Sequence, residues 1–452
     1  MPECIPQLSL SFHPSHPVVV SFDAPRSSSD GGALLLRAAD EKLRWTERLA
    51  ACLTEWRRPD RVRHGLIEQL RQRIYQIALG YEDVNDADHL RRDPVLLTVC
   101  DRQPHDGEGL SSQPTLCRFE NQVSARDLRR LLNAFEDDYV ASLPPDTQEL
   151  ILDIDSTHDP THGRQQLAFF HGYFDDSIYH PLLVFDGDTG QLASVLLRPG
   201  RCHSSRGAEA LLRRLIRKIR RRLPAARILV RGDSHFAMPR ILRELERLDH
   251  RLGGIDYLLG LAKNQRLVRW SERSLQRARR EAERTGKSAR TFTVLRYRAN
   301  SWKRLRRVIV RAEHNRYWGA NPRFVVTSLQ GSAQRLYELY CQRGDCENRI
   351  KDLKNALAAD RLSCHRFQAN VFRLLLHAAA YRLLWTLRDR AARSSARLGR
   401  AQFDTLRLRL LKVAALVKPS RRRIWIRLPE SFVEARLFAE LATGLDPPLH
   451  PV

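Results

Sequence analysis

The segment ELILDIDST at residues 149–157 has the pattern of a buried strand, and it decides the fold class. Apolar residues dominate it, as in strands that are covered on both faces, and it ends on the acids Asp153 and Asp155. The segment ARILVRGDSHF at 226–236 repeats this form and ends at Asp233. Amphipathic helical patterns at 206–223 and 238–249 flank this second strand. Strands that alternate with helices of this length predict an α/β or α+β layered fold.

Further strands and helices are predicted on both sides of this region. Strand patterns lie at 179–187, 192–198, 256–262 and 323–329, and long helical patterns lie at 333–357 and 368–393. Residues 38–145 have apolar side chains at helical spacing, and a Pro/Ser-rich stretch precedes them. The end of the chain is predicted to be a helix at 402–417 followed by a basic strand-like segment at 420–429.

The charge of the chain indicates a polyanionic partner. Its 452 residues hold 77 Lys and Arg against 52 Asp and Glu, a net charge of +25, and all but 9 of these cations are arginine. A GC-rich genome would inflate arginine through codon usage alone. Residues 263–322, however, hold 18 basic and 4 acidic residues, and codon usage does not concentrate charge in this way. Apolar and basic residues alternate at 291–299 and 304–314, which predicts strands with one cationic face.

Other classes of protein fit the sequence poorly. No run reaches the roughly 18 apolar residues of a membrane helix, and the first residues lack the pattern of a signal peptide, so we expect a cytoplasmic protein. Eight scattered cysteines suit reduced thiols. A structural zinc site at Cys341, Cys346, Cys364 and His365 is an alternative, although the four-residue gap between the first two suits a helix face better.

A helix signature supplies a third acid. In YCQRGDCENRIKDLK (340–354), four polar residues fall within about 60° of one another on an ideal helix: Tyr340, Arg343, Glu347 and Lys354. A solvated helix face with an ion pair between Arg343 and Glu347 would be an ordinary explanation. That explanation leaves the Tyr and the second cation on the same face unexplained. A helix that places one carboxylate on a metal ion, with cations beside it to hold phosphates, needs this set of residues.

Three acids from two strands and a helix suit two-metal phosphoryl chemistry. Two Mg²⁺ ions about 3.5–4 Å apart activate a water or a 3′-hydroxyl and stabilise the leaving oxygen during attack on a phosphodiester. Mg²⁺ prefers oxygen ligands and keeps several waters, so a few carboxylates are enough. Asp153 lies two residues before Asp155 and would point to the same face of the strand, so it competes for the same role.

These motifs resemble a known family. The spacing Y-(2)-R-(3)-E-(6)-K is the signature of bacterial insertion-sequence transposases of the DDE type. Other segments are similar to members of the DDE-domain group 1 branch, and the resemblance covers about residues 40–420: LDIDSTHDPTHG, FHGYFDDSIYHPLLVFDGDTG, VRGDSHFAMPRIL, NPRFVVTSL, GYEDVNDADHLRRDP and LSSQPTLCRFEN.

The resemblance implies a site and its cofactor. Asp155, Asp233 and Glu347 match the three catalytic acids, which would bind two Mg²⁺ or Mn²⁺ ions. Tyr340, Arg343 and Lys354 would contact DNA phosphates near the cut. Relatives cut through a hairpin intermediate and hold a flipped base against an aromatic residue of the insertion, for which Trp302 and Trp318 are the candidates.

The resemblance also implies an organisation of the chain. The expected fold is an RNase H-like core with a β-rich insertion, a helical N-terminal domain that binds DNA, and a helical C-terminal region. The expected boundaries are a loose leader at 1–37, the N-terminal domain at 38–145, the core at 146–262 and 323–366, the basic insertion at 263–322, and the C-terminal region with its basic tail at 367–452.

The implied function is cut-and-paste transposition: hydrolysis of phosphodiester bonds at terminal inverted repeats, followed by transfer of the 3′-ends into target DNA. The partners would be double-stranded DNA and a second copy of the chain, in the bacterial cytoplasm at the nucleoid. Two alternatives stay open, a catalytically inactive derivative that acts as a DNA-binding regulator and a plain RNase H-like nuclease. A zinc site at His158 and His162 is a further alternative, but a turn separates these residues rather than a helix.

Overall fold

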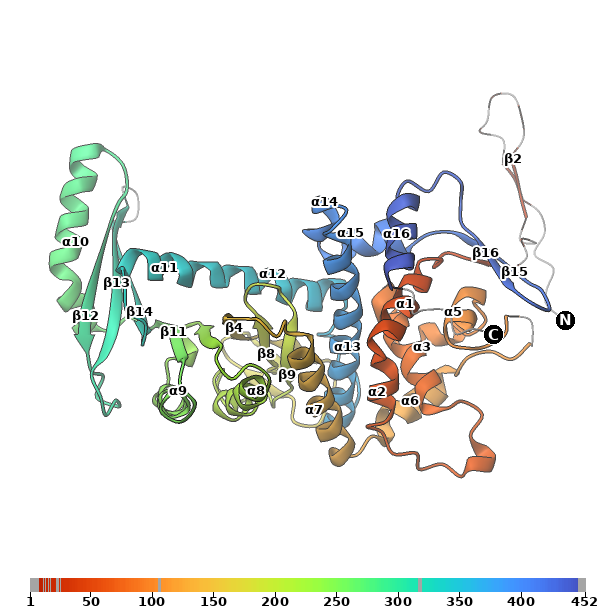
Figure 1. Cartoon of the computed structure of the whole chain (residues 1–452), viewed down its shortest axis with the longest axis horizontal. Coiled ribbons are helices and arrows are strands. Elements are labelled where there is room, and N and C mark those ends of the chain that lie inside the picture. Colours follow the sequence, from red (N-terminus) through yellow and green to blue (C-terminus); the bar gives the residue numbers. More distant parts are fainter. Residues whose placement is uncertain are drawn as a thin grey trace. The chain divides into compact units, whose positions relative to one another are not determined.

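The chain folds into two compact units (Figure 1). This computed structural model describes residues 8–445 except for 11, 13, 15, 17, 22, 23, 25, 105–106 and 316–318. Unit 1 consists of Met1–Ala50, Glu55–Phe119 and Leu383–Val452, and unit 2 consists of Ala51–Thr54 and Glu120–Arg382.

Unit 2 is built on an eight-stranded sheet with the order β12-β13-β14-β11-β10-β4-β8-β9. Strands β4, β10 and β11 are parallel to one another, whereas the remaining neighbours pair antiparallel. The five strands β9-β8-β4-β10-β11 form the predicted RNase H-like core. The bounds are β4 Glu149–Ser156, β8 Leu182–Asp186, β9 Leu192–Leu196, β10 Arg227–Gly232, β11 Ile255–Leu261, β12 Ala289–Tyr297, β13 Arg306–Asn315 and β14 Gly319–Thr327.

Helices cover both faces of this sheet, as Figure 1 shows. On one face lie α8 (Ala208–Arg222), α9 (Pro239–Leu252) and α10 (Gln265–Thr285), and their apolar sides join one buried apolar cluster with residues of the sheet. The helix that starts at Ala333 crosses the other face, where Leu336 and Tyr337 pack with Leu258, Ile309 and Val325 in a separate cluster. The alternating strands and helices of the sequence therefore form a layered α/β fold, as predicted, and the layers number three.

The predicted β-rich segment at 263–322 is only partly made of strands. It begins with the 21-residue helix α10, which the sequence analysis did not predict. Leu267 is the only large apolar side chain of α10 that is buried; Val268 and Leu275 pack against the core partly buried, and the small residues Ser271, Ser274, Ala278 and Ala282 complete the buried side. Such a stripe gives a weak apolar signal among many arginines. The rest of the segment forms β12, β13 and the start of β14, which extend the main sheet beyond β11.

Unit 1 is mainly helical. Helix α1 (Ala33–Leu43) has Leu35 and Leu36 fully buried, so regular structure starts earlier than the expected leader boundary at 37. The predicted helix at 402–417 ends near Leu411, and a strand begins at Ala415. A small sheet with the order β16-β15-β3 completes the unit: β3 Ser27–Ser28, β15 Ala415–Pro419 and β16 Ile424–Arg427.

The remaining elements are shorter or connect the units. In the sequence of unit 1 these are α2 Trp45–Ala50, α3 Leu66–Leu79, α4 Asp86–Leu90, α5 Pro94–Val99, α6 Gln113–Gln122, α14 Ala396–Gly399, α15 Phe403–Leu406 and α16 Ala435–Leu445, and α6 runs on into unit 2. Unit 2 also contains α7 Ala125–Ser142, β5 Asp159–Pro160, β6 Phe169–His171 and β7 Asp176–Tyr179. Helix α13 (Phe367–Ala391) begins in unit 2 and ends in unit 1. No helix among the described residues combines the length and the apolar character of a membrane span.

Candidate active site

Asp155 and Asp233 lie side by side at the carboxyl ends of two neighbouring parallel strands. In the register of β4 and β10, Ile154 is opposite Gly232, and each of the two acids follows directly. Neighbouring strands are about 4.8 Å apart, so the two acids start from adjacent backbone positions. The buried apolar residues of both strands fix this register, because a slip by one residue would turn the apolar side chains out of the core.

Glu347 approaches the same edge from a long helical segment. The segment runs through α11 (Ala333–Cys341), a 3₁₀ turn at Gln342–Gly344, α12 (Asp345–Lys351) and a π-helical turn at Asp352–Ala356. The helix predicted at 333–357 is thereby confirmed, although it is not regular. Single π-turns inside helices occur often at functional sites.

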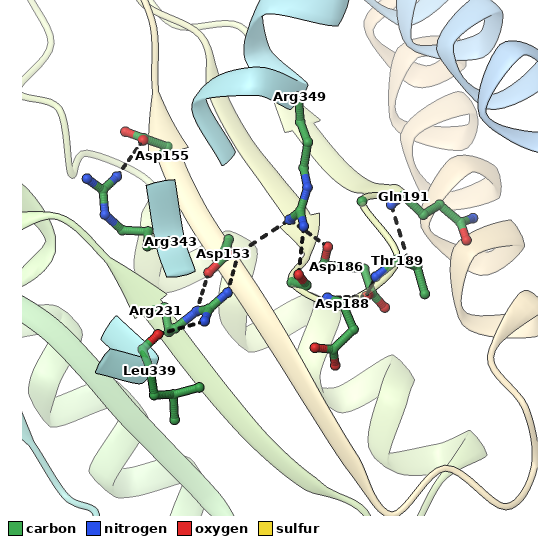
Figure 2. A network of polar contacts seen from close by, with 12 residues as sticks. Asp153, Asp155, Asp186, Asp188, Thr189, Gln191, Arg231, Leu339, Arg343 and Arg349 are labelled. Atoms are coloured by element: carbon green, nitrogen blue, oxygen red, sulfur yellow. Dashed lines mark hydrogen bonds and ion pairs between the residues drawn. The ribbon is translucent and has the colours of Figure 1, made fainter. Parts of the chain in front are cut away.

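The side chain of Asp155 is the electrostatic centre of the cluster. Burial raises its pKa to about 6, the Arg343 guanidinium opposes this shift, and the nearby carboxylates of Asp233 and Glu347 add to it. Arg343 Nη1 donates to Asp155 Oδ2 at 2.9 Å (Figure 2). The backbone N–H of Ser156 donates to Asp155 Oδ1 at 2.8 Å. Within the described residues Arg343 therefore pairs with Asp155 rather than with Glu347.

Asp153 has a different environment, which settles its competition with Asp155. Its carboxylate is fully buried and accepts two hydrogen bonds from Arg231, at 2.7 and 2.8 Å (Figure 2). Arg349 Nη1 lies 3.3 Å from the same carboxylate and donates to the Asp186 carbonyl oxygen, and Arg349 Nη2 donates to the Gly187 carbonyl oxygen. Asp153 thus ties β4 to β10 and to α12, and its oxygens are not available to a ligand.

Tyr340 and Lys354 flank the acids on the same helical segment. Lys354 Nζ donates to the carbonyl oxygen of His158 at 2.7 Å and lies 3.5 Å from Asp360 Oδ2. Tyr340 is packed so closely over β11 that a Cβ on Gly260 would come within 2.6 Å of its hydroxyl. The same Cβ would come within 2.9 Å of the backbone nitrogen of Ser234, next to Asp233. Gly260 is thus a residue of the site that the sequence analysis did not single out.

A cationic cavity of about 440 Å³ opens beside Asp233. Its lining includes Asp233, Tyr337, Tyr340, Lys263, Arg311 and Arg323. Arg311 and Arg323 face each other directly across β13 and β14, an arrangement of like charges that destabilises a sheet unless an anion compensates. Arg311 is paired with Glu313 at 2.6 Å. The alternation of basic and apolar residues predicted the cationic strand face, but only the fold places it next to Asp233.

The structure describes one of the two tryptophans expected to stack on a flipped base. Trp302 is 6% exposed within the main core, where its ring contacts Tyr297 edge-on and lies under the Arg306 guanidinium. A flipped base therefore has no free face of Trp302 to stack on, and the candidate is wrong. Trp318 lies outside the described residues.

His158, His171 and His180 pack around the ring of Phe174. The ring of His158 stacks on Phe174 with centroids 4.2 Å apart, and burial lowers the pKa of His158. Cys341, Cys346 and Cys364 are reduced cysteines. In the part of the chain that the structure describes, no three His, Cys, Asp or Glu side chains are grouped closely enough to hold one metal ion together.

Comparison with known proteins identifies the family of the chain. The transposase DDE domain group 1 family matches residues 11–448. No protein of curated function matches the chain. Among solved structures, the cryo-EM structure of a piggyBac transposase synaptic complex with hairpin DNA is similar at 12% sequence identity and a TM-score of 0.47, covering 94% of this chain and 87% of that one. Because the family match spans nearly all of the sequence, the chain belongs to the transposase DDE domain group 1 family.

Proposed function

We propose that the protein is a cut-and-paste transposase of an insertion sequence. It hydrolyses phosphodiester bonds at terminal inverted repeats and transfers the resulting 3′-hydroxyl ends into target DNA. The observation that carries the proposal is the meeting of Asp155 and Asp233 on adjacent strand ends, with Glu347 close enough to affect the ionisation of Asp155. No side-chain nucleophile is needed for this chemistry.

The acids suit a divalent metal site. DDE transposases generally use divalent metal ions, and Mg²⁺ and Mn²⁺ prefer carboxylate oxygens. Asp155, Asp233 and Glu347 would hold the metal, which we propose to be two Mg²⁺ or Mn²⁺ ions. When bound, the metal would activate the attacking oxygen and stabilise the leaving one. The Arg343 guanidinium, now 2.9 Å from Asp155, has to release this carboxylate before the three acids can converge.

The cations around the acids would hold the DNA backbone. Once Arg343 leaves Asp155, its planar guanidinium is placed to bind a phosphate with two hydrogen bonds. Lys354 and the Tyr340 hydroxyl flank the same edge. On the other side of Asp233, Lys263, Arg311 and Arg323 line the cavity and would hold a neighbouring phosphate.

The rest of the proposed reaction requires recognition and pairing of two DNA ends. We propose that the helical segment 38–145 recognises the inverted repeats and that two copies of the chain act together, one on each end. The product of each cut would stay bound until it is joined to target DNA.

Cleavage and joining assays test the proposed reaction. The substrate is duplex DNA from the flanks of the coding region that carries short inverted repeats, incubated with the full chain and Mg²⁺ or Mn²⁺. We expect strand cleavage at the repeat ends, followed by joining of the 3′-ends to a plasmid. Cleavage without joining would indicate a plain nuclease, and specific binding without cleavage would indicate a DNA-binding regulator. Either outcome would refute the proposal.

A further inference from the structure

A second cationic surface lies in unit 1, on the hairpin of β15 and β16. The two strands are joined by the turn Ser420–Arg423, which contains three consecutive arginines. Inside the turn, the Ser420 backbone N–H donates to the Arg423 carbonyl oxygen at 2.8 Å. The Arg423 backbone N–H donates to Ser420 Oγ at 3.1 Å. These bonds hold the turn closed, and Arg421 and Arg422 are exposed at its tip.

A fourth arginine joins this turn from the other end of the sequence. Arg26 directly precedes β3, and its carbonyl oxygen accepts a hydrogen bond from the Val417 backbone N–H at 2.9 Å. This bond places Arg26 at the end of the small sheet where the turn lies. Its backbone is left-handed, with φ 44°, a conformation that is unfavourable for a non-glycine residue. Such strain often marks functional positions.

The four arginines surround one open cavity of about 870 Å³. Its lining consists of Arg26, Gln103, Pro419, Ser420, Arg421, Arg422, Arg423 and Ile424. The lining contains no acid. One more cation, Lys418, lies on the hairpin itself, opposite the exposed Trp425.

The four arginines of this cavity differ from several other exposed arginines of unit 1, which form ion pairs with carboxylates. Among the described residues, none of the four makes an ion pair. In the same unit, four other exposed arginines each pair with a carboxylate: Arg44 with Glu47, Arg58 with Asp60, Arg397 with Glu434 and Arg436 with Glu440. Four like charges with no counter-charge from the residues that the structure describes repel one another, and a polyanion would relieve that repulsion.

We propose that this surface, which we call the arginine hairpin, binds the phosphate backbone of double-stranded DNA without reading its sequence. Its residues belong to unit 1, whereas Asp155, Asp233 and Glu347 belong to unit 2. The choice of DNA rests on the proposed function. Guanidinium groups bind phosphates in a bidentate manner, and contacts to phosphates alone carry no sequence information. The arginine hairpin therefore adds affinity and leaves the recognition of the ends to other residues.

The test compares two full-length variants with the same change in charge. In the first, Arg26, Arg421, Arg422 and Arg423 are all changed to Gln. In the control, the ion-paired Arg44, Arg58, Arg397 and Arg436 are all changed to Gln. Binding to a random-sequence duplex is measured over a range of NaCl concentrations. Circular dichroism and thermal denaturation confirm that both variants fold.

We expect the first variant to bind DNA with a weaker dependence on salt concentration. Each phosphate contact contributes about 0.9 to the slope of log K against log salt, so the first variant should lose up to about 3.6 from the slope of the wild type. At 100 mM NaCl its affinity should fall at least about 100-fold, whereas the control keeps nearly the wild-type slope. The loss should be equal on a duplex that carries the inverted repeats.

Three outcomes would overturn the inference. The first is a wild-type slope in the first variant, and the second is an equal loss in both variants. The third is a case of the first in which the first variant keeps the wild-type slope on DNA but loses binding to vesicles of phosphatidylserine and phosphatidylcholine. That result would assign the surface to a membrane. If the wild type itself fails to bind duplex DNA, the proposed function fails as well, so the two failures are distinguishable.

Discussion

The buried carboxylate of Asp155 should weaken the fold that holds it. Its pKa rises from 3.8 to about 6, mainly because burial removes water from the charged form. Between these two values the folded state binds the proton more tightly than the unfolded state, so stability falls as the pH rises through this window. Above about pH 6 the ionised Asp155 carboxylate lowers the stability of the folded state by the full amount. Replacing Asp155 by Asn, which has the same shape and no charge, should remove it.

The size of this effect follows from the shift. A difference of about two pKa units, at 1.36 kcal/mol per unit, corresponds to about 3 kcal/mol of stability at pH 8. For a unit of this size, about 1 kcal/mol changes the melting temperature by roughly 2–4 °C. We therefore expect Asp155→Asn to melt roughly 6–12 °C higher than the wild type at pH 8, and to differ little from it at pH 4.

Differential scanning calorimetry in EDTA measures both proteins at the two pH values. Asp345→Asn serves as the control, because it removes an exposed carboxylate from α12 and should change stability by less than about 1 kcal/mol. An Asp155→Asn variant that melts at or below the wild-type temperature at pH 8 would refute the reasoning. A stabilisation of equal size at pH 4 would refute it too, since ionisation could not then be the cause.

Four other changes test the remaining features of the site. Asp153→Asn should destabilise unit 2 by roughly 3–5 kcal/mol in calorimetry, because it leaves buried guanidinium groups without their counter-charge; wild-type stability would contradict the structural role. Gly260→Ala should lower the rate of DNA cleavage by displacing Tyr340, while an unchanged rate would show that the close contact is dispensable. Arg323→Gln should weaken the binding of cleavable DNA and reduce its salt slope by about 0.9, and an unchanged slope would remove Arg323 from the DNA-binding surface. Mn²⁺ at 100 times its dissociation constant should stabilise the wild type by about 2.7 kcal/mol and Asp155→Asn by much less, so equal stabilisation would place the metal elsewhere.

The central sheet could be predicted because its signals are local. The strands ending at Asp155 and Asp233 are short apolar runs between turns and helices, and the fold places both acids where the sequence indicated. The helix that carries Glu347 was also clear from its spacing. Buried positions of this kind leave a strong pattern, since a polar substitution there would be costly.

Other features depend on contacts that no local pattern reveals. Asp153 and Asp155 are alike in the sequence, and only the arginines Arg231 and Arg349, which come from distant segments, separate their roles. Helix α10 was missed because small residues line its buried side. Unit 1 contains residues from both ends of the chain. Patterns along the sequence do not show that two such distant segments pack together.

Single-turnover cleavage of DNA bearing the inverted repeats tests the central claim most directly. The wild type is compared with Asp155→Ala, Asp233→Ala and Glu347→Ala, and Glu338→Ala, an exposed acid on α11, serves as the control. We predict that each of the three variants binds the DNA but loses Mg²⁺-dependent cleavage, while Glu338→Ala cleaves like the wild type. Substantial cleavage by any one of the three variants would contradict the assignment of that acid to the active site.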